Sequence, residues 1–194
     1  MQQEIEAKFL STDHDVIRQK LTSLGATCEQ PMRTMRRVTF DNAAMKAKNG
    51  WIRVRDEGDK VTVTYKQVNE LSADGVHEIE TTVGSFDDMV AILRATELAG
   101  GSFQESKRET WHLGDVEVVL DEWPWLKPYI EIEGPSEAAI QDVAQRLRLD
   151  WSQAQFGDVM VAYRAQYPHL QRGDTVGDLP EVRFNAPLPD LLKP

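Results

Sequence analysis

The chain has 194 residues, of which 41% are hydrophobic, and this suits one domain with a substantial core. Its 32 acidic residues outnumber 22 basic ones, and the formal net charge of −10 argues against nucleic acid or a membrane as partner, because both need a basic surface. The single cysteine, Cys28, excludes an internal disulfide and a cysteine-based metal site. With no signal-like N-terminus and no long apolar run, we expect a cytoplasmic protein without a membrane span.

The first predicted strand covers residues 4–9. Because side chains alternate between the two faces of a strand, Glu4, Glu6 and Lys8 share one face, and the other face is apolar. Taken alone, this pattern is typical of an edge strand with one solvated face. Capping residues and apolar residues at helical spacing then predict a helix over 11–24.

The next part of the chain predicts four strands, at 33–41, 51–55, 61–66 and 77–83, with a loop over 42–50. A turn at 57–59 favours an antiparallel hairpin between the second and third of these strands. Ionisable side chains again share the polar faces, and they are Arg53, Arg55, Lys66, Glu78 and Glu80.

A second amphipathic helix is predicted over 85–98, ended by Gly100-Gly101. Three more strands follow at 106–112, 116–122 and 129–133, with Arg108, Asp121, Glu131 and Glu133 on their polar faces. Two further helices are expected, over 136–147 and 158–167. The remainder, 168–194, is rich in Pro, Gly and Asp, so we expect an extended tail packed on the domain through Val182 and Phe184.

The polar strand faces together carry seven carboxylates, from Glu4, Glu6, Glu78, Glu80, Asp121, Glu131 and Glu133, and five cations, from Lys8, Arg53, Arg55, Lys66 and Arg108. One interpretation is an open sheet whose charged face lies in water. The other is a closed barrel with the charges inside and helices on the apolar outer faces. Enclosed charges of both signs need partners. A phosphate chain bound to Mg²⁺ or Mn²⁺ would supply an anion for the Lys and Arg side chains and a cation for the carboxylates.

The same segments resemble one known family in sequence and in order. The opening EIEAK resembles the ExExK signature of the CYTH superfamily, the triphosphate tunnel metalloenzymes, which includes class IV adenylyl cyclases, thiamine triphosphatases and inorganic triphosphatases. Further landmarks are FD at 40–41, WIRVR at 51–55, TYK at 64–66, HEIE at 77–80, LDEW at 120–123 and YIEIEG at 129–134. The resemblance covers residues 1–167 and implies an α+β fold, in which an eight-stranded antiparallel closed β-barrel, or tunnel, has helices packed outside.

The resemblance also implies roles for the charged residues. The triphosphate would be held by Lys8, Arg53, Arg55, Lys66 and Arg108. One or two Mg²⁺ or Mn²⁺ ions would be held by Glu4, Glu6, Asp121, Glu131 and Glu133, with Glu78 and Glu80 near them. The chain departs from the family at Ser106, where the family often has a lysine two residues before the strand arginine. Alternation points the neighbouring Lys107 outward, which leaves the identity of a general base open.

We therefore predict a metal-dependent hydrolase of inorganic tripolyphosphate or a small organic triphosphate, with the catalytic domain at 1–167 and a tail at 168–194. The alternatives are a class IV adenylyl cyclase that makes cyclic AMP from ATP, and a polyphosphate- or nucleotide-binding module without turnover. Trp51 shares the face of Arg53, where it either stacks on an organic base or plugs the barrel end. The four histidines are scattered, and we assign them structural or surface roles. The expected partner is a small-molecule triphosphate, and a homodimer is one alternative for the assembly.

Overall fold

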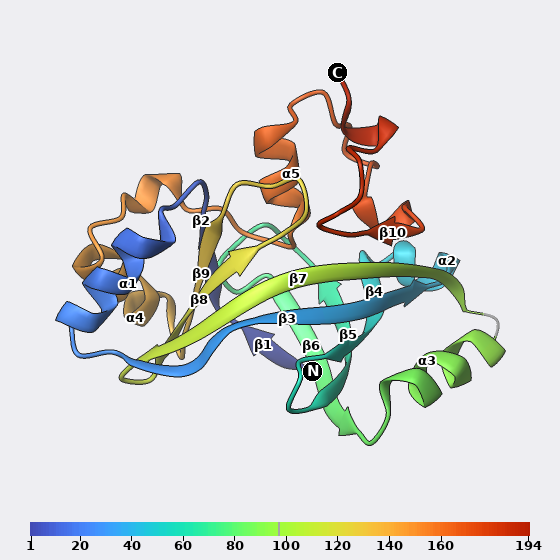
Figure 1. Cartoon of the computed structure of the whole chain (residues 1–194), viewed down its shortest axis with the longest axis horizontal. Helices are drawn as coiled ribbons and strands as arrows, with labels where there is room; N and C mark the ends of the chain where they lie inside the picture. Colours follow the sequence, from blue (N-terminus) through green and yellow to red (C-terminus); the bar gives the residue numbers. More distant parts are fainter. Residues whose placement is uncertain (97) are drawn as a thin grey trace.

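In a computed structural model, which describes residues 1–96 and 98–194, the strands form one curved sheet with helices outside it (Figure 1). The strands of the sheet follow the order β1-β6-β5-β4-β3-β7-β8-β9-β2. Their bounds are β1 Gln2–Glu4, β2 Glu6–Phe9, β3 Thr27–Asp41, β4 Gly50–Asp56, β5 Val61–Val68, β6 Val76–Val83, β7 Ala99–Leu113, β8 Val116–Glu122 and β9 Tyr129–Glu133. A further strand, β10 (Glu181–Val182), pairs in parallel with β7 outside this path.

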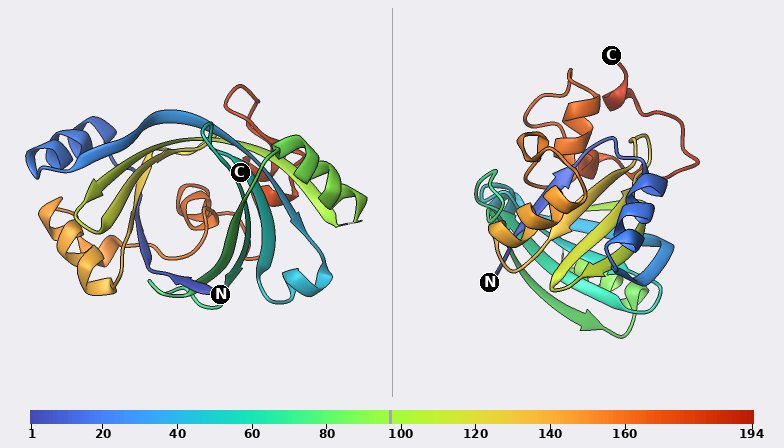
Figure 2. Two further views of the ribbon diagram at one scale, coloured as in Figure 1. Left: turned by 90° about the horizontal axis from the view of Figure 1, so that it is seen from below. Right: turned by 90° about the vertical axis from the view of Figure 1, so that its left-hand side faces the viewer.

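The opening stretch of the chain closes the sheet. β1 pairs antiparallel with β6 at one end of the strand order, and β2 pairs antiparallel with β9 at the other. Only Ile5 separates the two, so one continuous stretch joins both ends and the sheet curls into a nearly closed barrel (Figure 2). With β1 and β2 counted as one strand, the nine strands of that order become the eight that the sequence predicted, and β10 is additional.

The helices pack on the apolar outer faces of the strands. α1 (His14–Ser23) and α4 (Glu137–Arg146) contribute to a core with the buried residues of β2, β8 and β9. α3 (Phe86–Ala95) packs in a second core with β3 and β4. Ala7 and Ile132 are fully buried in the first core, while the residues next to them in sequence line the barrel interior. This alternation between buried and interior-facing residues is the pattern that the sequence predicted.

A third core joins one end of the barrel to the end of the chain. It contains Trp123 and Tyr129, together with residues of α5 (Met160–Gln166) and of the tail, among them Val182, which is fully buried. α5 is seen through the ring of strands in the view along the barrel (Figure 2), and Figure 1 places it beyond one end of the strands. Since residues of α5 and of the tail also line the interior cavity, this part of the chain covers one end of the barrel.

The structure corrects several predicted boundaries. A short helix, α2 (Ala43–Lys46), forms inside the predicted loop because the Asn42 side chain accepts a hydrogen bond from the Met45 backbone N–H. α3 ends at Ala95 rather than at 98, and the expected glycine stop belongs to β7 instead. The predicted segment also includes Glu97, which lies outside the described residues. Among the helices of the described ranges, none has both the length and the apolar character of a membrane span.

Candidate active site

The barrel encloses a cavity of about 1100 Å³. All seven carboxylates and all five cations that the sequence predicted line this cavity. The structure therefore brings side chains from separate strands into one enclosed space, as the closed-barrel interpretation requires. Glu78 and Glu80 both lie on its wall, because they are two residues apart on β6.

Lys8 of β2 is almost completely buried and bridges two strands. Its Nζ lies 2.7 Å from Glu6 Oε1 and 3.2 Å from Glu131 Oε1, and Glu131 is its direct neighbour on β9. Burial alone would lower the pKa of Lys8, but Glu131 and Glu6 outweigh it and raise the pKa above its ordinary value. Lys8 therefore remains an ammonium group inside the barrel.

Lys66 and Arg108 form two further ion-pair groups. Lys66 of β5 lies 2.7 Å from Glu4 and 3.3 Å from Glu78, so it links β5 to β1 and β6. Arg108 of β7 donates to both oxygens of Asp121, from Nε at 2.8 Å and from Nη2 at 2.5 Å, and Nη2 also reaches Glu131 at 2.7 Å. Forked pairing of this kind is the geometry that a guanidinium also uses with phosphate.

The two arginines of β4, Arg53 and Arg55, lie in a part of the wall where positive charges are close to one another. Arg53 donates to Thr64 at 3.1 Å and lies 3.5 Å from Glu80. Burial, followed by the charge of Arg55, lowers the pKa of Arg53 to about 10. Arg55 donates twice to Glu57, whose own pKa falls below its usual value because this pairing outweighs the effect of burial.

Sequence reasoning missed three buried residues of this site. Glu57 was assigned to a turn, but it is 4% exposed and holds Arg55. Tyr129 and Arg37 line the cavity and were given no role. Alternation could have found Tyr129, which is two residues before Glu131, whereas the arginines of β3 stand on both faces of that strand and did not distinguish Arg37.

The donor set fits a hard divalent ion. Glu6 pairs directly with Glu133 across β2 and β9. Burial raises the pKa of Glu6, and the charge of Lys8 offsets this only in part. Part of the Glu133 side chain is exposed to solvent. The protein around it nevertheless desolvates the carboxylate, and this desolvation, followed by the charges of Glu4 and Glu6, raises the pKa of Glu133 to about 8. Crowded carboxylates of this kind are stabilised by a cation, and an all-oxygen donor set suits Mg²⁺ or Mn²⁺.

The cavity also offers unsatisfied donors for an anion. In the part of the chain that the structure describes, the Nε atoms of Arg37 and Arg53 are buried and have no hydrogen-bond partner. A buried polar group without a partner is costly, and an anionic ligand would satisfy both atoms. The residues present therefore fit a metal ion and a polyanion together.

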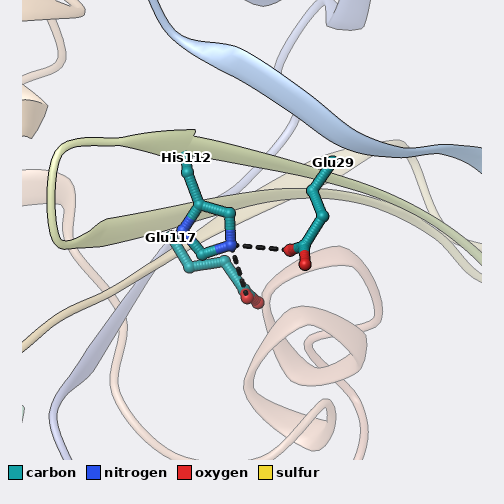
Figure 3. Close-up of side chains that lie close together, drawn as sticks. All are labelled: Glu29, His112 and Glu117. Carbon is teal, nitrogen blue, oxygen red and sulfur yellow. Dashed lines mark hydrogen bonds and ion pairs between the residues drawn. The ribbon is translucent and has the colours of Figure 1, made fainter.

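A smaller group of metal-ligand side chains lies at the rim. His112 of β7 places Nε2 2.7 Å from Glu29 and 3.7 Å from Glu117, and Glu117 also lines the cavity (Figure 3). These side chains are exposed or half-exposed and pair with one another. We therefore keep the surface role that the sequence assigned to His112 and place no metal ion in this group.

The nearly closed antiparallel barrel with a charged interior defines a tunnel-type protein. The chain belongs to the CYTH family, because the CYTH domain model matches residues 2–157. This family includes triphosphatases and class IV adenylyl cyclases, and its enzymes in general depend on divalent metal ions. A search of curated proteins finds no significant match to the sequence.

Solved structures share the fold at low sequence identity. PH1012 from Pyrococcus horikoshii OT3 is 21% identical with a TM-score of 0.69, over 82% of this chain and 98% of that chain. A candidate adenylate cyclase from Vibrio parahaemolyticus is 13% identical with a TM-score of 0.71, over 83% and 97%. HpAC1 from Hippeastrum, for which a dominant triphosphatase activity is described, is 15% identical with a TM-score of 0.55, over 84% and 96%.

Proposed function

We propose that this protein is a divalent-metal-dependent triphosphatase, which hydrolyses inorganic tripolyphosphate or a small organic triphosphate. The observation that carries the proposal is the convergence of seven carboxylates and five cations on one cavity. A purely anion-binding pocket needs no carboxylates, and a purely metal-binding pocket needs no cations. A triphosphate with a divalent ion uses both sets.

The ion pairs support separate roles for the two sets of side chains, with the cations binding phosphate and the carboxylates binding metal. On binding, the phosphate oxygens would take the place of carboxylates at the cations, which are Lys8, Arg53, Arg55, Lys66 and Arg108. The carboxylates released in this way would hold Mg²⁺ or Mn²⁺, and they are Glu4, Glu6, Asp121, Glu131 and Glu133, with Glu78 and Glu80 close by. When bound, the metal ion supplies positive charge against the phosphoryl oxygens. The basic side chains fix the phosphate chain, so that the terminal phosphoryl group is presented to water in one orientation.

A class IV adenylyl cyclase is the second candidate, because the same wall would hold the triphosphate of ATP. Trp51 lines the cavity and offers a surface for an adenine ring. Trp123 is less suited to stacking on a base, since the guanidinium of Arg37 lies over its ring at 4.4 Å. Since the charged wall suits both reactions, we place hydrolysis first on the activity described for HpAC1.

We also propose that residues 1–167 form the catalytic domain and that 168–194 are a tail that completes one end of it. The burial of Val176, Val182 and Leu192 against Trp123 and α5 supports this division.

A phosphate-release assay tests the function. Purified protein with Mg²⁺ or Mn²⁺ is incubated with tripolyphosphate, thiamine triphosphate, ATP and GTP, and we expect phosphate from at least one of them. The variants E4A and K8A should lose this activity, while K107A should keep it, because Lys107 pairs with Glu122 outside the cavity. With ATP, cyclic AMP and pyrophosphate would indicate the cyclase, whereas ADP and phosphate would indicate the hydrolase. A panel without any phosphate release refutes the proposed hydrolase.

A further inference from the structure

Arg37 is a buried cation of the cavity wall that is not one of the five predicted cations. It is 8% exposed and lies on β3, directly opposite Arg55 of β4. Each of the five predicted cations has a carboxylate partner, whereas Arg37 has none among the residues that the structure describes. Burial of an unpaired guanidinium is costly, so this arrangement calls for a compensating group.

Neutral groups position the Arg37 side chain. Its Nη2 donates to Ser106 Oγ at 2.7 Å, and its guanidinium carbon lies 4.4 Å from the ring centre of Trp123. Ser106 and Trp123 are both buried, so these contacts fix the guanidinium in one place. They provide one hydrogen bond and one aromatic face, and Nε remains without a partner. The side chain is therefore held firmly while its charge is left uncompensated.

The surroundings increase the need for an anion. Burial, followed by the charges of Arg53, Arg55 and Arg108, pushes the pKa of Arg37 well below its ordinary value, and Asp121 offsets this only in part. A guanidinium nevertheless stays protonated in proteins. The wall around Arg37 therefore carries an excess of positive charge that the protein itself does not balance.

We propose that Arg37 is a sixth phosphate-binding cation, which contacts the triphosphate directly and is positioned by Ser106 and Trp123. This inference rests on the proposed function. The contact with Ser106 supports this inference, because the family resemblance implies a lysine at position 106. Arg37 reaches that position from β3, so a charge missing from β7 is supplied by the neighbouring strand.

Equilibrium binding tests the inference without turnover. The probe is the imido analogue of tripolyphosphate, whose P–N–P bridges resist hydrolysis, titrated with Mg²⁺ present in an isothermal calorimeter. R37Q should bind it about 10- to 100-fold more weakly, as the loss of a charge-assisted hydrogen bond predicts. R36Q is the matched control and should bind within about twofold of wild type, because Arg36 points outward and pairs with Asp56. R37Q/S106K should regain most of the affinity, which a purely structural role for Arg37 would not produce.

The outcomes separate this inference from the proposed function. If K8A loses binding while a folded R37Q keeps wild-type affinity, the inference is wrong and the proposed function stands. If wild-type protein does not bind the analogue, this inference is wrong, and the phosphate-release panel decides separately on the proposed function. If R37Q does not fold, R37M decides, because it keeps the length of the side chain and removes its charge: weaker binding supports a direct contact, and wild-type affinity would leave Arg37 a structural role only.

Discussion

At the scale of single residues, the five predicted cations of the cavity wall are each paired with a carboxylate. Lys8 is held by Glu6 and Glu131, and Arg108 by Asp121 and Glu131. Such pairs hold cations and carboxylates in an enclosed space at tolerable cost. The same pairs set the positions from which each partner can turn to a phosphate oxygen or to a metal ion. Under the proposed function, these pairs hold both sets of side chains ready for a ligand that carries both charges.

Two neighbouring residues of β8 separate the site from the outer surface. Asp121 faces the cavity and is 1% exposed, while Glu122 pairs with Lys107 on the other face. We expect D121N to lower kcat/KM for the best substrate by more than about 100-fold, because it removes a charged ligand and leaves Arg108 short of its partner. E122Q should remain within about twofold of wild type. Equal losses in both variants, measured by phosphate release, would contradict the assignment.

Alternation along a strand was sufficient to predict twelve of the charged residues of the wall, since each of these lies at a polar position opposite an apolar one. It failed for Arg37 because β3 carries register shifts in its first half and basic residues on both faces. Alternation also failed for Glu57, because this residue precedes a turn glycine and no strand pattern there predicts that its side chain is buried. Both residues are identified by contacts across strands, which a local pattern does not contain.

At the scale of elements, one buried ion pair ties α1 to the barrel. Arg18 of α1 donates from Nε and Nη2 to the carboxylate of Glu109 on β7, each at 3.0 Å, and Trp111 donates to the same carboxylate at 2.6 Å. Glu109 is 5% exposed. Burial alone would raise its pKa, but these hydrogen bonds outweigh it and lower the pKa below 4.5. The pair therefore stabilises the fold only while Glu109 is ionised.

The variant E109Q measures this contribution. We expect it to lower the free energy of unfolding by about 1–2 kcal/mol at pH 7, allowing for the partial exposure of Arg18. Because the folded pKa of Glu109 is depressed, the stabilisation is present above the unfolded pKa and is lost as the pH falls through the folded pKa. Urea unfolding should show the difference between wild type and E109Q shrinking as the pH falls below about 4. A difference that does not change with pH would contradict this explanation.

Helix and strand types were predictable, whereas some boundaries were not. Caps such as Ser85 and Ser136, together with helical periodicity, located α3 and α4 within a few residues. The lengths of β3 and β7 were underestimated, since the missed part of each strand contains few apolar residues and pairs with the predicted part of the other. β10 was missed because two residues give no periodic signal, and its pairing with β7 depends on the path of the tail.

At the scale of the whole molecule, the stretch formed by β1 and β2 both closes the barrel and carries residues that we propose as ligands. Glu4 lies on β1, which pairs with β6, while Glu6 and Lys8 lie on β2, which pairs with β9. The seam of the barrel is therefore lined by three of the residues proposed to bind metal or phosphate. Closure at this seam could not be inferred from local pattern, because it depends on which strands lie at the two ends of the sheet.

Ligand binding across the barrel should stabilise the whole chain. Tripolyphosphate analogue and Mg²⁺ at about 100 times the dissociation constant should add about 2.7 kcal/mol. For a chain of this size the melting temperature should then rise by roughly 5–10 °C. Removal of the metal with EDTA should reduce the shift to less than half, because the carboxylates would again compete with phosphate for the cations. An equal shift in EDTA, measured by differential scanning fluorimetry, would argue against a metal ion at the site.

A crystal soaked with Mn²⁺ and the imido analogue of tripolyphosphate tests most directly whether metal and polyphosphate share the barrel interior. We expect anomalous manganese density beside Glu6 and Glu131, with phosphorus positions running past Lys8, Lys66 and the arginines of β4. Manganese bound only at the rim by Glu29, His112 and Glu117, or an analogue bound outside the barrel, would contradict the assignment of the cavity as the active site.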